Sequence, residues 1–125
     1  MNTDRVCGRG DGDAVMSSPS VDEAAIQDTV VRSLRTATGR IDMDELRRLE
    51  QQLLAHIALL YPAADAATDR LWRGSIGWYT RRATLDGIRR QAEQGLGDGP
   101  LAAHIQVSAL ARDCQWLLTQ HREGR

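Results

Sequence analysis

Residues 71–93 read LWRGSIGWYTRRATLDGIRRQAE and hold two of the protein's three tryptophans and one of its two tyrosines. At 100° per residue, a helix over this stretch carries an apolar stripe with Gly74 in its middle, formed by Leu71, Trp78, Leu85, Ile88 and Ala92. A second, shorter stripe lies roughly opposite and consists of Trp72, Ile76, Tyr79 and Ala83. Both faces of such a helix must be covered, by its own bundle, by a second subunit or by a ligand.

Two helices are predicted before this stretch. The first begins at Ser20, which forms a capping box with Glu23, and it ends before Gly39. The second begins with a capping box formed by Asp42 and Glu45. It ends at Tyr61-Pro62, because the residue before a proline avoids the α region. Its apolar side chains recur every three or four residues and are Leu46, Leu49, Leu53, Ile57 and Leu60.

A third helix is predicted from Pro62 or Asp65 to Glu93. Unbroken, it would be about 45 Å long at 1.5 Å per residue, so we expect a bend between Gly74 and Gly77 or an overhang used for assembly. A glycine-rich turn then leads to Pro100, which suits the first position of a fourth helix that frays from His121. The apolar residues of this last helix are Leu101, Ile105, Leu110, Cys114, Leu117 and Leu118.

No alternating β-branched run appears anywhere in the sequence, so no strand is predicted. Four amphipathic helices with short connections indicate an all-α fold, a small up-down antiparallel bundle. A three-helix core with the first helix at its periphery is the alternative. Residues 1–19 lack apolar periodicity and are expected to form a disordered tail, which leaves residues 20–125 as the helical bundle domain.

The composition restricts the classes of partner. A net charge of -1 and a pI near 6.3 argue against a nonspecific nucleic-acid binder. No apolar run is long enough to cross a bilayer, and the start of the chain has no signal-like apolar segment, so we expect a cytoplasmic protein without a membrane partner. Cys7 and Cys114 are too few for a disulfide framework and are expected to be reduced thiols.

The aromatic residues and arginines give two candidate sites. A ligand pocket between helices would be lined by Trp78, Tyr79, Arg81, Arg82 and His56. An interface would use Trp72, Ile76, Tyr79 and Trp116, since tryptophan and tyrosine dominate protein contacts. The arginines lie at the margins of the main apolar stripe, where they either cover the core and pair with Asp86, Asp113 or Glu50, or bind an anion.

No catalytic residue, metal site or cofactor is predicted. The three histidines, His56, His104 and His121, show no Glu-x-x-His or His-x-x-x-His spacing, and there is no Cys-x-x-Cys pair. Cys114 lacks an adjacent base or a positive helix end, so it is interpreted as a core residue and not a nucleophile.

Several segments between His56 and His121 resemble the DUF6415 family of small uncharacterised actinobacterial proteins. They are residues 71–74 (LWRG), 78–79 (WY), 85–89 (LDGIR) and 110–118 (LARDCQWLL). The resemblance implies a streptomycete type of origin and a loose association with natural-product biosynthesis. It names no reaction, so it assigns no role to any residue.

Together these patterns favour a non-catalytic helical accessory protein that binds a protein partner or itself, as a homo-oligomer such as a dimer. The alternative is a small-molecule-binding protein or a small tailoring enzyme that takes an aromatic or anionic metabolite between its helices. A regulator that contacts DNA through Arg73, Arg81 and Arg82 is a third hypothesis, and no helix-turn-helix spacing supports it.

Overall fold

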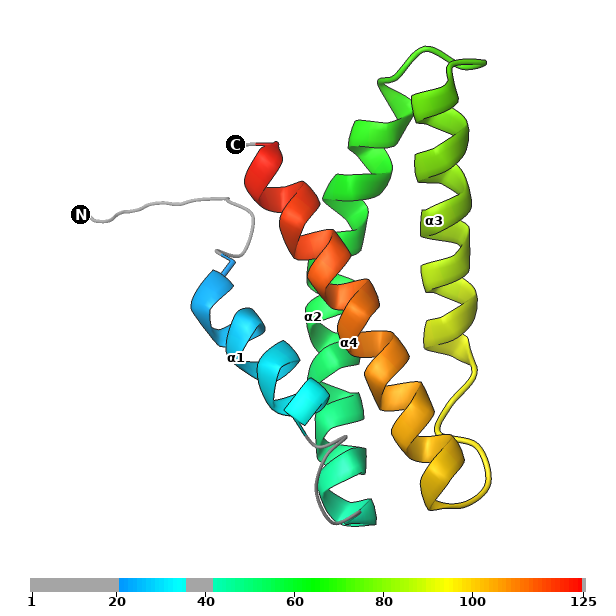
Figure 1. Cartoon of the computed structure of the whole chain (residues 1–125). Helices are drawn as coiled ribbons and strands as arrows, with labels where there is room; N and C mark the ends of the chain where they lie inside the picture. Colours follow the sequence, from blue (N-terminus) through cyan, green and yellow to red (C-terminus); the bar gives the residue numbers. More distant parts are fainter. Residues whose placement is uncertain (1–20, 36–41, 125) are drawn as a thin grey trace, which may run out of the picture.

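The computed structural model describes residues 21–35 and 42–124. The predicted tail, together with Ser20 and Gly39, lies outside these residues. The described residues form four helices, α1 (Glu23–Arg35), α2 (Met43–Asp69), α3 (Ile76–Glu93) and α4 (Pro100–Glu123). Successive helices run in opposite directions (Figure 1), so the predicted all-α up-down bundle is confirmed.

The bundle is built around the pair α2 and α4, which share the most extensive contact. Helix α1 packs against one side of this pair and α3 against the other, and in the described residues α1 and α3 do not touch (Figure 1). The core between them consists mainly of aliphatic side chains, among them Ile26, Val30, Leu46, Leu49, Leu53, Leu85, Ile88, Val107, Leu110, Leu117 and Leu118.

The helix starts follow local capping. The side chain of Asp42 accepts hydrogen bonds from the backbone N–H groups of Asp44 and Glu45, so the predicted start of α2 is confirmed. Helix α1 begins at Glu23, three residues later than predicted. The Asp22 carboxylate accepts a hydrogen bond from the backbone N–H of Ala25 at 3.0 Å and therefore caps the start of this helix.

The predicted end of the second helix at Pro62 is wrong, because α2 continues through this proline to Asp69. Contacts on both sides of Pro62 offset the lost backbone hydrogen bond. The Tyr61 hydroxyl donates to the carbonyl of Leu85 on α3 at 3.3 Å, and Thr68 is buried in the bundle. Residues 63–69 are also rich in alanine, the strongest helix former.

The predicted long third helix is also wrong, since residues 70–75 form a turn and α3 begins at Ile76. Gly74 adopts a φ of +97°, which L side chains rarely adopt, and Ser75 caps α3 by accepting from the N–H of Trp78 at 3.1 Å. The expected bend near Gly74 is therefore a complete break. Trp72 lies in the turn, so the second stripe is not confined to a helix.

Helix α4 faces the core with Leu110, Cys114, Leu117 and Leu118, as predicted, but not with the two predicted residues of its N-terminal part. Leu101 and Ile105 are 68% and 58% exposed, and the buried face carries several small or polar residues, namely Ala103, Gln106, Ser108, Ala111 and Cys114. The predicted fraying from His121 is wrong as well, because the helix extends to Glu123.

Candidate functional site

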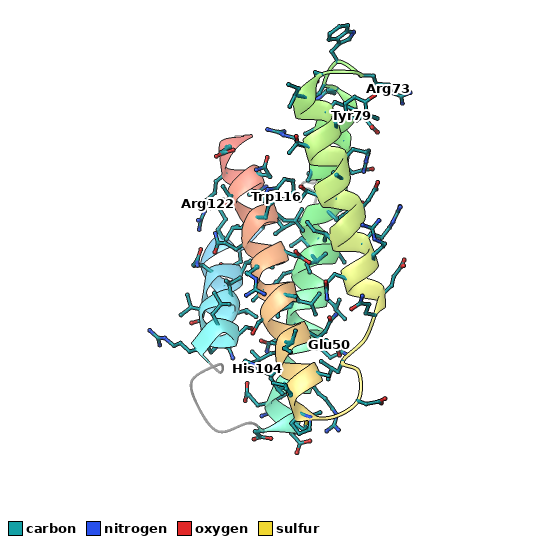
Figure 2. All side chains as sticks on the ribbon, turned by 45° about the vertical axis from the view of Figure 1, so that its right-hand side comes forward. Glu50, Arg73, Tyr79, His104, Trp116 and Arg122 are labelled. Carbon is teal, nitrogen blue, oxygen red and sulfur yellow. The ribbon has the colours of Figure 1, made fainter. Side chains whose placement is uncertain are left out.

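Three large apolar side chains are exposed where α2 and α3 meet. Trp72 is 80% exposed, Ile76 85% and Tyr79 61%, and we call these three residues the tip patch. Figure 2 shows Arg73 and Tyr79 at this end of the molecule, beyond the end of α4. Because water-exposed apolar groups of this size promote association, the tip patch is a candidate contact surface.

The half-buried ring of Trp78 lies beneath the tip patch. The Arg73 guanidinium lies 5.9 Å from its ring centre, and Tyr79 meets it edge-on with ring centres 5.0 Å apart. Its indole Nε1 is buried and has no hydrogen-bond partner among the described residues. The cation beside the Trp78 ring is therefore Arg73 of the turn.

Arg82 joins the tip of the molecule to the rest of the bundle through ion pairs. Its guanidinium lies 2.5 Å from an oxygen of Asp65 and 3.4 Å from one of Asp69, both on α2. Its Nε is 3.7 Å from Asp86 on α3. The hydrogen bond to Asp65 and the surrounding negative charge raise the pKa of Arg82, although partial burial opposes this. Arg82 is thus fully engaged in joining α2 to α3.

A groove opens between α2, α3 and the C-terminal half of α4, where α4 leans away from α3 and towards α1 (Figure 1). Its volume is about 360 Å³. Leu60, Ala63, Ala64, Ala67 and Thr68 of α2 form its floor, and Trp116 and Leu117 of α4 form a wall. Arg81 of α3 and Gln120, His121 and Glu123 of α4 bring polar groups to it. We call this cavity the α2–α4 groove.

A sequence profile of a family of unknown function, DUF6415, matches residues 24–125. The chain belongs to the DUF6415 family. No curated protein and no solved structure matches it. Membership of DUF6415 fixes a relationship over nearly the whole bundle but assigns no reaction to it, so the chemistry of the site rests on the side chains themselves.

In this DUF6415 chain the residues of the predicted ligand pocket lie in four different places. Trp78 and Tyr79 are at the tip, and Arg82 is held by aspartates. Arg81 lines the α2–α4 groove together with Trp116, which the sequence had assigned to the interface. His56 faces α1 and not α3, with its Nε2 3.1 Å from the hydroxyl oxygen of Thr29. Partial burial lowers the pKa of His56, which favours a neutral ring in this contact.

Two titratable groups on α4 have shifted pKa values. Burial raises the pKa of Asp113 to about 6, with the charge of Arg112 opposing the shift. Burial, and secondarily the charge of Asp113, raises the pKa of Cys114 to about 12. The Cys114 thiol is therefore protonated at neutral pH, which agrees with a core residue. Within residues 21–35 and 42–124, no three His, Cys, Asp or Glu side chains are placed to hold a metal ion.

No helix in the described part of the chain is long and apolar enough to cross a bilayer. The sequence reasoning also missed two features of the fold. The alanines at positions 63, 64 and 67 were not singled out, and they leave the space of the groove. Gln106 is buried and donates to the backbone carbonyl of Gln91 at 2.7 Å, joining α4 to α3. A polar residue within an apolar helix face is the signal that could have identified the second feature.

Proposed function

We propose that this protein is a non-catalytic helical accessory protein that associates with a second copy of itself through the tip patch. The observation that carries the proposal is the exposure of Trp72, Ile76 and Tyr79 at one end of the molecule. Side chains of this size expose roughly 500 Å² together, estimated from the areas typical of large apolar residues. A standard interface buries about 800 Å² on each partner, so the patch is large enough to form its centre.

The charges around the tip patch suit a two-fold contact. Each copy carries exposed Arg70 and Arg73 beside the partly exposed Asp69. In an isologous dimer each surface element meets the other copy's version of the same patch. An antiparallel arrangement can place an arginine of one copy against the aspartate of the other, while the apolar side chains meet at the centre.

The proposal also covers the origin of the protein and the kind of pathway that it assists. The resemblance to actinobacterial relatives implies an association with natural-product biosynthesis, in which an accessory protein of this kind would act in the cytoplasm. All sixteen basic residues are arginine, a composition typical of a genome rich in G and C, which supports such an origin.

The test is the subunit mass as a function of concentration, measured by native mass spectrometry and sedimentation velocity. The wild type is expected to form a dimer, and Trp72→Ala and Ile76→Ser are expected to be monomeric. Ile105→Ser is the matched control, because Ile105 is a similarly exposed apolar residue on α4, outside the tip patch. A wild type that stays monomeric at all concentrations, or a dimer that survives both tip variants, contradicts the proposal. A monomer would instead direct the search to a different protein partner for the same patch.

A further inference from the structure

We propose that the α2–α4 groove is a binding site for a small apolar monocarboxylate, a compound with one carboxylate and an aromatic or aliphatic body. Arg81 pairs with the carboxylate, and the alanine floor and Trp116 enclose the body. This site is separate from the tip patch and does not depend on self-association.

The space for the ligand follows from small side chains on α2. Ala63, Ala64 and Ala67 each end at Cβ, and α4 leans away from α3 at this level (Figure 1). The hollow lies at the surface between three helices, where exposed Ala63 and half-buried Ala64 and Ala67 leave an apolar floor that a ligand can cover. Its volume of about 360 Å³ lies at the lower end of the range for small-molecule sites.

The ligand is expected to be an anion because two neighbouring arginines of α3 differ in their ion pairs. Arg82 is surrounded by three aspartates. Arg81 is also partly buried, yet among the described residues it makes no hydrogen bond or ion pair. Its guanidinium offers a planar pair of donors that matches a carboxylate, and a partly desolvated cation without a partner is stabilised by such an anion.

The other polar groups of the groove limit the ligand to a single negative charge. The Nε2 of His121 lies 3.5 Å from Glu23 on α1, a carboxylate that also pairs with Arg122 at 3.1 Å, so this nitrogen already has an anionic neighbour. Glu123 adds a negative charge to the rim. A phosphate dianion would therefore meet one unpaired cation and one repelling carboxylate, whereas a monocarboxylate needs only Arg81.

The wall contributed by Trp116 covers the apolar body. Trp116 is half-buried, lines the groove and lies on the C-terminal half of α4, where Figure 2 labels it. An indole ring supplies a large apolar face for an aromatic or aliphatic group. Its fluorescence is also expected to change when the groove is filled, a change that adds to the constant emission of Trp72 and Trp78 at the tip.

The first experiment compares acids with their uncharged amides. We would titrate the full chain with 4-phenylbutyrate, octanoate and the corresponding amides, and follow binding by calorimetry and by tryptophan fluorescence. The acids are expected to bind with submillimolar dissociation constants. The amides are expected to bind about tenfold more weakly, because they lose the charge-assisted hydrogen bonds to Arg81.

Two variants locate the site, each with a matched control. Arg81→Gln is expected to weaken the acids about tenfold and leave the amides unchanged, whereas Arg90→Gln, an exposed arginine on the same helix, changes neither. Ala67→Leu fills the floor and is expected to abolish binding, and Ala66→Leu, an exposed neighbour outside the groove, is the control. Circular dichroism and melting temperature verify that each variant is folded.

The acids should also raise the melting temperature of the wild type but not of folded Ala67→Leu, because a ligand stabilises only a protein that binds it. The proposal is overturned if neither acid binds at millimolar concentration, if acids and amides bind equally, or if Arg81→Gln and folded Ala67→Leu bind like the wild type. Trp72→Ala is expected to bind the acids normally, so a failure of the dimer proposal leaves this test intact.

Discussion

The pKa of Asp113 depends more on the surroundings of its carboxyl group than on the ordinary value for an aspartate. Asp113 lies on α4 next to Cys114, and its carboxylate is partly removed from water with only Arg112 as a nearby favourable charge. Burial disfavours the ionised form and raises its pKa from 3.8 to about 6. In the unfolded chain the same group would lose its proton near its ordinary pKa.

The raised pKa of Asp113 makes folding dependent on pH. Between about pH 4 and pH 6 the folded protein holds a proton on Asp113 that the unfolded chain has released, so the free energy of unfolding falls as the pH rises through this window. Discounted for solvent screening, the loss is about 1–2 kcal/mol. Asp113→Asn cannot ionise and is expected to be more stable than the wild type by this amount at pH 8 and nearly equal to it at pH 4.

Urea denaturation at a series of pH values measures this difference. The lowered pKa of His56 acts in the opposite direction, because the unfolded chain takes up a proton there as the pH falls. That contribution is common to both proteins and cancels when they are compared. Asp98→Asn, on the exposed loop before α4, is the control. A constant gap between Asp113→Asn and wild type across the pH range would contradict the assignment.

At the scale of the helical elements, two local sequence features bear on where α2 ends and α3 begins. Pro62 predicts a helix end, and the segment from Gly74 to Gly77 predicts a bend within the next helix. The helix passes Pro62 because Tyr61, Asp65 and Asp69 are all tied to α3. It ends before Gly74, where the chain takes a conformation that favours glycine.

Gly74 and Gly77 therefore form a matched pair for substitution by alanine. A Cβ at either position meets no atom within 4 Å, so steric clashes do not differ between them. Gly74→Ala is expected to lower the free energy of unfolding by about 1 kcal/mol, because it forces alanine into positive φ. Gly77→Ala, in the first turn of α3, is expected to raise it by about 0.5 kcal/mol through helix propensity. Denaturant midpoints give both values, and equal effects of the two substitutions would contradict the turn geometry.

At the scale of the whole molecule, the helices differ in how much they bury. Nine residues of α4 are buried but only Leu85 and Ile88 of α3. The N-terminal half of α3 contacts solvent through the tip patch and one side of the groove, and it is attached to α2 mainly by Arg82 and Tyr61. Stability is therefore concentrated in the central pair α2 and α4.

Amide hydrogen exchange should show that α3 is less stable than α4. Amides of residues 76–83 in α3 are expected to exchange before those of residues 107–118 in α4, because local opening of α3 exposes few buried side chains. Mass spectrometry of peptides after timed deuterium labelling measures both segments in one experiment. Equal protection in the two segments would show that the bundle opens only as a single unit.

The sequence by itself determined the class of fold and most helix positions. Apolar spacing, the Asp42 cap and Pro100 at the start of α4 are local features, and local features are set by neighbours along the chain. Periodicity also separated Trp72, Ile76 and Tyr79 from the core, although it did not show that Trp72 lies in a turn.

Only the tertiary structure decided which of two adjacent arginines is paired, that Leu101 and Ile105 of α4 stay exposed and where the long third helix breaks. Arg81 and Arg82 look equivalent in the sequence, but Arg82 meets two aspartates of α2 and Arg81 meets the α2–α4 groove. His56 was placed with the wrong neighbour for the same reason. These outcomes depend on contacts between residues far apart in the chain, whose energies exceed the small local preferences that a sequence displays.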